Sequence, residues 1–163
     1  MNDLLLRPVR CDDLLLLFDH QRDAVASYMA AFGSATPDDR AVFDARWAHL
    51  LSDPQITVRS IVLAAEVVGH VLRFTLFGDC EISYWIARPH WGRGIATAAL
   101  RRFVAEQAPR PLHARVAKCN AGSIRVLQRC GFVVCGEGRA FAEARGVEVE
   151  EFVFRLGAQP VPQ

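Results

Sequence analysis

The residues whose spacing most directly indicates chemistry form a glycine-containing stretch, residues 91–97. Gly92 and Gly94 stand one residue apart, between a run rich in aromatic and β-branched residues and a run whose apolar residues have helical spacing. Glycine lets backbone N–H groups face outward without a Cβ in the way, and a helix N-terminus adds partial positive charge. The stretch therefore predicts a binding site for an anion such as a phosphate group.

Three classes of phosphate ligand use glycine-containing loops of this kind, and the neighbouring residues separate them. A Walker loop requires Lys and Ser or Thr after its second glycine, whereas Ile95 and Ala96 follow Gly94 here. A dinucleotide fingerprint requires Gly or Ala at position 97, which is Thr, and a carboxylate about twenty residues further on. Residues 107–136 contain no acidic residue and five basic ones. This basic segment favours a ligand with several phosphates, and coenzyme A is such a ligand.

The elements around the loop predict an α+β fold. Short turns between strand-like runs indicate an antiparallel meander before the loop, and helical and strand-like runs alternate after it. The predicted element order is β-α-α-β-β-β-α-β-α-β-β. In residue numbers, the strands are expected at 4–8, 56–65, 67–77, 80–86, 112–117, 132–135 and 148–156, and the helices at 12–32, 37–53, 95–108 and 120–130.

Length and composition predict one globular domain over residues 1–163, with 52% hydrophobic and 23% charged residues. The net charge of +1 gives no general attraction to nucleic acid or membrane surfaces, and no apolar run approaches the ~20 residues of a membrane span. The start of the chain lacks the basic region of a signal peptide, so we expect a cytoplasmic protein. The five cysteines and five histidines show no ligand spacing, so we expect no metal site.

A second motif lies in residues 120–132, which begin Asn-Ala-Gly-Ser and end Cys-Gly-Phe. It resembles the second signature of the GNAT N-acetyltransferase family, and residues 93–96, Arg-Gly-Ile-Ala, are similar to the acyl-coenzyme A loop of that family. The resemblance extends over residues 4–156. Within the family, Tyr-Trp-Ile at 84–86 followed by residues 91–97 most resembles the branch of the ribosomal-protein alanine N-acetyltransferases.

The resemblance implies α/β/α layers around a mixed, mostly antiparallel sheet, whose fourth and fifth strands splay apart to admit the pantetheine arm. It implies acetyl-CoA as co-substrate, with its pyrophosphate on backbone N–H groups of residues 92–97. Asn120 would reach the pantetheine amides, and Ser123 would lie near the phosphates. The residues assigned to coenzyme binding are Tyr84, Trp85, Ile86, Trp91, Gly92, Arg93, Gly94, Ile95, Ala96, Thr97, Asn120, Ser123 and Arg125.

Acetyl transfer to an amine requires a neutral amine, a stabilised oxyanion and a proton for the departing thiolate. Family members often place a basic Glu on the fourth strand, which assigns that role to Glu81, with backbone amides at residues 85–86 as the oxyanion site. Many members use a Tyr as the acid, but Leu127 stands at that position. Ser123 and Tyr84 are the substitutes in the same neighbourhood, and water is a third option.

The acceptor is expected on the other side of the splayed strands, under the first helices and the last loop. His20 and Gln21 interrupt an apolar helix, and Phe141 lies in the last loop, so these three are the predicted substrate contacts. The predicted function is acetyl transfer to a primary amine, either a protein N-terminus or a small molecule, by direct attack in a ternary complex. The alternative is a non-catalytic acyl-CoA sensor or partner-binding module, which Leu127 favours. A homodimer is compatible with both.

Overall fold

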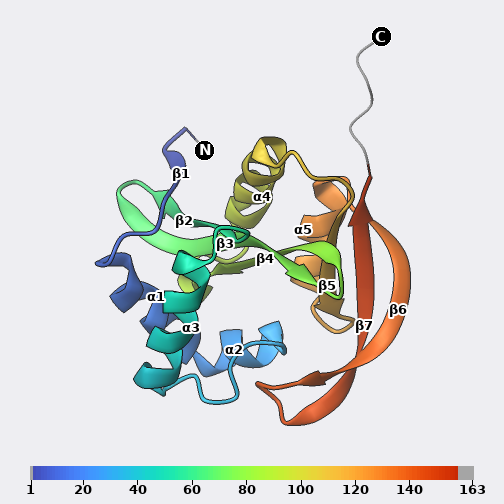
Figure 1. The fold of residues 1–163 in the computed structure, drawn as a ribbon, viewed down its shortest axis with the longest axis horizontal. Coiled ribbons are helices and arrows are strands. Elements are labelled where there is room, and N and C mark those ends of the chain that lie inside the picture. Colours follow the sequence, from blue (N-terminus) through green and yellow to red (C-terminus); the bar gives the residue numbers. More distant parts are fainter. Residues whose placement is uncertain (1, 158–163) are drawn as a thin grey trace.

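The computed structural model describes residues 2–157 and shows an α+β protein whose seven-stranded sheet carries helices on both faces (Figure 1). The elements in chain order are β1 (Leu4–Arg7), α1 (Asp13–Arg22), α2 (Ala24–Ala30), α3 (Arg40–Ser52), β2 (Thr57–Leu63), β3 (Glu66–Leu76), β4 (Asp79–Ile86), the 3₁₀ turn η1 (Arg88–His90), α4 (Ile95–Glu106), β5 (Leu112–Ala117), α5 (Ala121–Arg129), β6 (Val133–Ala142) and β7 (Val147–Leu156).

The strands follow the order β1-β2-β3-β4-β5-β7-β6 in the sheet. Every neighbouring pair is antiparallel except β4 and β5, which are parallel. Within residues 2–157, β4 and β5 are in register at one pair only, Glu81 opposite His113. The mostly antiparallel mixed sheet is therefore confirmed, and its fourth and fifth strands separate beyond this pair.

Two helical layers bury the two faces of the sheet. On one face, α4 and α5 contribute Phe103 and Leu127 to the main core. On the other face, α1 and α3 contribute Leu17 and Trp47 to a second core, which packs on β2 and β3. Each such side chain contributes about 1.5–3 kcal/mol when it is fully buried. No helix of the described chain is long and apolar enough to cross a membrane.

The first helical region differs from the single helix that was expected to reach Phe32. α1 ends at Arg22, Asp23 has extended backbone, and α2 starts one residue later. The Asp23 carboxylate accepts a hydrogen bond from the Ala26 N–H at 3.0 Å and pairs with Arg88 at 2.7 Å. Asp is a strong N-cap residue, so it starts a new helix where apolar periodicity alone suggests continuity. Three helices, not two, therefore precede β2.

A buried charge network fixes the start of α1 to the sheet. Asp13 is 4% exposed and pairs with Arg7 at 2.6 Å. It also accepts hydrogen bonds from the Ser60 hydroxyl at 2.7 Å and the Arg10 N–H at 2.8 Å. Burial alone would raise the pKa of Asp13, but these donors outweigh it and lower the pKa to about 2.

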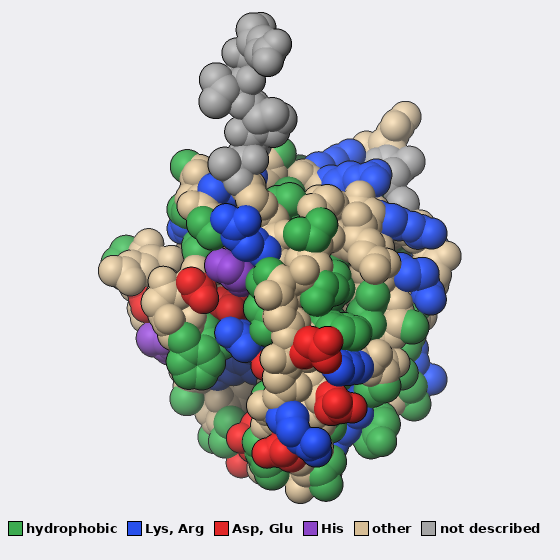
Figure 2. Space-filling model, turned by 90° about the vertical axis from the view of Figure 1, so that its right-hand side faces the viewer, with side chains coloured by type: hydrophobic (Ala, Val, Ile, Leu, Met, Phe, Trp, Pro, Cys, Tyr) green, Lys and Arg blue, Asp and Glu red, His purple; other side chains and the backbone are tan. Residues whose placement is uncertain are grey.

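The last two strands form a hairpin whose tip reaches the end of α2 (Figure 1). Arg145 Nε donates to the Tyr28 carbonyl at 2.7 Å, and its guanidinium lies 4.2 Å from the Tyr28 ring centroid. The Ala144 N–H donates to the Ala31 carbonyl at 3.1 Å. Acidic and basic side chains are interleaved on the face that Figure 2 shows, and Arg139 pairs with Glu148 across the hairpin.

Candidate active site

A cavity of about 1170 Å³ is lined by both helical layers and by strands β3, β4 and β5. It follows the separation of β4 from β5 beyond the Glu81–His113 pair. Gly69 of β3 lies opposite the end of β4, where a Cβ would be 2.0 Å from the Trp85 carbonyl oxygen. Only glycine permits this close approach, which holds the end of β4 against β3 while β5 diverges.

Alternation along β4 divides the cavity into two halves. Ile82, Tyr84 and Ile86 point to the layer of α4 and α5, whose core they join or contact. Glu81 and Trp85 are on the opposite face, toward the layer of α1, α2 and α3. We refer to these as the α4–α5 half and the α1–α3 half of the cavity.

The glycine loop lines the α4–α5 half. Gly92 and Gly94 have left-handed backbone, with φ values of 72° and 75°, and Gly94 is the N-cap of α4. The first backbone bond of α4 runs from the Ala98 N–H to the Gly94 carbonyl at 3.0 Å. The N–H groups of residues 95–97 therefore have no acceptor within the helix. With no acidic residue in the first turn, the loop fits a pyrophosphate group.

Two side chains of the loop are used to hold its shape. The Trp91 indole N–H donates to the Ile86 carbonyl at 2.8 Å, which ties the loop to the end of β4. Arg93 is in hydrogen-bond contact with His90 at 3.0 Å and does not line the cavity. The other predicted coenzyme residues all line it: Tyr84, Trp85, Ile86, Trp91, Gly92, Gly94, Ile95, Ala96, Thr97, Asn120, Ser123 and Arg125.

The second motif is placed against β4 by the cap of α5. Asn120 accepts from the Ser123 N–H at 3.1 Å and donates to the Met29 carbonyl of α2 at 3.2 Å. The Tyr84 hydroxyl lies 2.6 Å from Ser123 Oγ. Burial raises the pKa of Tyr84, so its phenol stays protonated at neutral pH. The structure thus brings together the two predicted proton donors, which are 39 residues apart in sequence.

Glu81 lines the α1–α3 half of the cavity and is 1% exposed. Burial raises its pKa, whereas Arg115, 3.2 Å away, acts in the opposite direction. Arg115 also pairs with Glu151 of β7 at 3.1 Å. Burial thus makes the ionised Glu81 carboxylate a stronger base than an exposed one, which suits it to accept a proton.

Sequence reasoning missed Gly69, Arg115 and Glu151. The available signal for Arg115 was its charge between the apolar residues Ala114 and Val116 in strand 112–117. Its partner could not be read from the sequence, because the contact depends on β7 inserting next to β5. Within residues 2–157, no group of three or more His, Cys, Asp or Glu side chains is arranged to hold a metal ion.

The predicted acceptor contacts are placed in three different environments. Gln21 lines the α1–α3 half and donates to the Pro37 carbonyl at 2.8 Å. His20 does not line the cavity, and burial lowers its pKa. Phe141 is 55% exposed on β6, also outside the cavity. Of the three predicted acceptor contacts, only Gln21 therefore lines the cavity that also contains Glu81.

Solved structures share this fold at low sequence identity. RimJ from Mycobacterium smegmatis, in complex with CoA-disulfide, is 24% identical with a TM-score of 0.78 over 98% of this chain and 84% of that chain. Spermidine N-acetyltransferase from Vibrio cholerae, in complex with CoA and spermine, is 18% identical with a TM-score of 0.76 over 95% and 96%. An N-acetyltransferase from Staphylococcus aureus is 18% identical with a TM-score of 0.79 over 94% and 98%.

No curated protein matches the chain. The family described as acetyltransferase (GNAT) domain matches residues 3–133, which include the glycine loop, the Asn120–Ser123 cap and Glu81. This match covers most of the sequence and agrees with the fold and with the predicted resemblance. The chain therefore belongs to the GNAT acetyltransferase family.

Proposed function

We propose that the protein is an acetyl-CoA-dependent N-acetyltransferase that acts on a primary amine by direct attack in a ternary complex. One observation carries this proposal: a single cavity joins the glycine loop to the buried carboxylate of Glu81. An anion-binding loop alone would fit any phosphate ligand. A base on the other side of the same cavity indicates a reaction rather than binding alone.

The residues of the α4–α5 half fit coenzyme A. Backbone N–H groups of the glycine loop would bind the pyrophosphate, and Arg125 on the exposed side of α5 would add positive charge. Asn120 and Tyr84 border the route between β4 and β5 that the pantetheine arm would take. Bound acetyl-CoA would supply the acetyl group, whose carbonyl carbon would gain a C–N bond to the amine and lose its C–S bond to coenzyme A.

The protein's own groups would handle the two protons of this reaction. Glu81, when ionised, accepts the proton that the attacking amine loses, directly or through water. Tyr84 keeps its proton and contacts Ser123, so we assign proton donation to the departing sulfur to this pair. Many members of the family supply this proton from a tyrosine at the position that Leu127 occupies in this chain. Leu127 is 1% exposed in the core and has no proton to donate.

The similar solved structures support coenzyme A as the co-substrate, but they do not identify the acceptor of this chain. The Mycobacterium smegmatis RimJ structure contains CoA-disulfide, and the Vibrio cholerae enzyme contains CoA. We also propose that the chain belongs to the branch of the ribosomal-protein alanine N-acetyltransferases. The basis is the Tyr-Trp-Ile and 91–97 pattern and the presence of Leu127.

The direct test adds acetyl-CoA and a panel of amines and measures thiol release. Peptides, amino acids, polyamines and aminoglycosides would be compared with buffer alone. Amine-dependent thiol release supports the proposal. Tight acetyl-CoA binding by calorimetry without turnover for any amine would instead support the alternative, a non-catalytic acyl-CoA sensor.

A further inference from the structure

The charges that line the α1–α3 half of the cavity are strongly unbalanced. Among residues 2–157, the carboxylates that line the whole cavity are Glu81 and Glu151. Both pair with the same cation, Arg115. No carboxylate of the described cavity wall is therefore left to pair with a second cation.

Such a second cation is present at Arg46 on α3. Phe43, Trp47 and Leu50 form the buried face of this helix, and Arg46 stands beside that face, where it lines the cavity. The side chain of Arg46 is exposed to solvent, although enough protein atoms lie around it to lower its pKa by desolvation. No described side chain or carbonyl group forms an ion pair or hydrogen bond with its guanidinium.

The groups around Arg46 leave its positive charge uncompensated. His70 of β3 lies under Trp47, with ring centroids 5.0 Å apart. Burial and the charge of Arg46 lower the pKa of His70 to about 3, so His70 is neutral at physiological pH. Trp85, opposite His70 on β4, is also uncharged. The five N–H donors of the Arg46 guanidinium have no acceptor among the described protein groups, so they are free to bind an anionic group of a ligand in the cavity.

We infer, on the basis of the proposed function, that the acceptor is a small amine that also carries an anionic group, a carboxylate or a phosphate-like group, and that Arg46 binds this group. A planar guanidinium matches both kinds of anion with paired hydrogen bonds. A polycation such as a polyamine would instead meet Arg46 with no free carboxylate on the described wall to bind its additional charges. Wild-type protein should therefore prefer an anionic amine to a polyamine.

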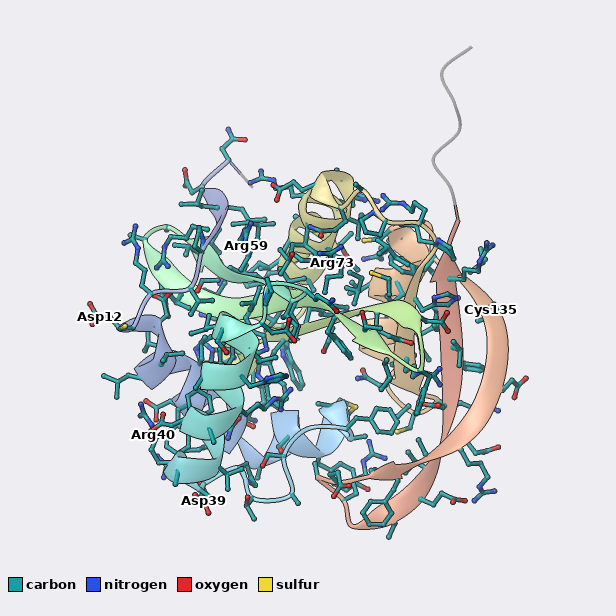
Figure 3. The ribbon with its side chains drawn as sticks, in the orientation of Figure 1. Asp12, Asp39, Arg40, Arg59, Arg73 and Cys135 are labelled. Atoms are coloured by element: carbon teal, nitrogen blue, oxygen red, sulfur yellow. The ribbon has the colours of Figure 1, made fainter. Side chains whose placement is uncertain are left out.

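The kinetic test compares acceptors that differ only in the anion. Each amino acid is paired with its amide, and each aminoalkylphosphonate with its dimethyl ester, using wild-type protein, Arg46→Gln and Arg40→Gln. Arg40 is a matched control, because it lies on the outer side of the same helix and pairs with Asp44 (Figure 3). The carboxylate and phosphonate arms show which anion is preferred.

The expected result is a KM for the anionic acceptor that rises about 10- to 100-fold in Arg46→Gln, the usual range for a lost charge-assisted hydrogen bond. The KM of the uncharged partner and the affinity for acetyl-CoA should change little in this variant, and Arg40→Gln should behave as wild type. Equal or better turnover of uncharged amines or polyamines by wild type, unchanged by Arg46→Gln, would overturn the inference and leave the acetyltransferase proposal intact.

A binding measurement keeps the inference testable if no amine is turned over. Thermal shift with the same acceptors, in the presence of coenzyme A, should show stabilisation of wild type by the anionic amines and a smaller effect in Arg46→Gln. The same measurement without coenzyme A shows whether the acceptor needs the coenzyme. Identical shifts for wild type and Arg46→Gln, or none with any anionic amine, would refute a role for Arg46.

Discussion

The two halves of the cavity use different parts of the polypeptide to bind. The α4–α5 half consists mainly of backbone N–H groups and small residues from two short segments, 92–97 and 120–123. The α1–α3 half consists of charged and aromatic side chains from α3, β3, β4, β5 and β7, among them Arg46, Glu81 and Arg115. The first half should therefore be damaged by adding atoms, and the second by removing them.

The largest effect is expected from adding a side chain to the α4–α5 half. Gly94→Glu places a Cβ on left-handed backbone and a negative charge beside the proposed pyrophosphate site. Acetyl-CoA binding should weaken by at least about 100-fold, because like charges in contact cost several kcal/mol. Calorimetry measures this loss.

Gly78→Glu is the control for Gly94→Glu. Gly78 also has positive φ, at 84°, but it lies in an exposed turn, where an added Cβ would meet no atom within 4 Å. This variant has the same backbone strain and added charge and should bind acetyl-CoA as wild type does. Similar losses in both variants would mean that strain, rather than the phosphate site, explains the result.

The next effect comes from removing a charge from the α1–α3 half. Glu81→Gln should lower kcat/KM by about 100-fold or more, the usual contribution of a positioned general base. Burial raises the pKa of Glu81, and only the ionised form is a base, so wild-type kcat/KM should fall as pH decreases through that pKa. A pH profile of the variant should lack this acidic limb.

Glu148→Gln is the matched control for Glu81→Gln, since Glu148 also pairs with an arginine but is exposed on β7. It should keep both the rate and the pH profile of wild type. If Glu81→Gln lost stability but retained its acidic limb, Glu81 would be a partner of Arg115 only.

A smaller effect, on the stability of the fold, is expected from disrupting the hydrogen-bond network of Asp13 with Arg7 and Ser60, which attaches α1 to the sheet. The pKa of Asp13 is lowered to about 2, so its stabilisation is present above the ordinary pKa of Asp and is lost as pH falls through about 2. Asp13→Asn should lower the free energy of unfolding at pH 7 by about 2 kcal/mol. Urea unfolding measures this change.

Asp12→Asn serves as the control for that substitution, since Asp12 is the exposed neighbour at the outer end of α1 (Figure 3). It should unfold like wild type. Equal stability of the Asp13 variant and wild type at pH 7 would show that burial of the carboxylate offsets its hydrogen bonds.

The smallest effect is expected from removing a single hydroxyl group in the α4–α5 half. Tyr84→Phe removes the hydroxyl that contacts both the Oγ and the carbonyl oxygen of Ser123, and it should lower kcat by about tenfold or less with unchanged acetyl-CoA affinity. Ser123→Ala and the double variant complete a cycle that reports whether the two hydroxyls act together. A weaker affinity with unchanged kcat would assign both residues to coenzyme binding rather than to proton transfer.

The contrast between the two halves of the cavity also explains which site residues could be predicted from the sequence. Gly92, Gly94, Asn120 and Ser123 belong to short contiguous motifs whose geometry is local, and the structure places all four on the cavity wall. The strands also follow local periodicity, although β6 extends to Ala142, beyond the predicted 132–135.

The α1–α3 half could not be predicted to the same extent, because its groups meet only through tertiary structure. Arg46, Glu81, Arg115 and Glu151 are far apart in sequence and come from four elements. His20 and Gln21 are neighbours in the chain, yet only Gln21 lines the cavity, because successive helical positions face different directions. The helix break at Asp23 depends on a side-chain cap that apolar periodicity does not report.

The contact between the β6–β7 hairpin and the end of α2 has a consequence for synthesis of the protein. Arg145 reaches back 117 positions to Tyr28, and β7 must insert between β5 and β6. A ribosome releases the chain from its N-terminus onward, so the glycine loop emerges well before the hairpin. A prematurely terminated chain would therefore contain both coenzyme motifs but lack β7 and its contribution to the cavity wall, Glu151. Acetyl transfer should begin only after the final strand has been translated.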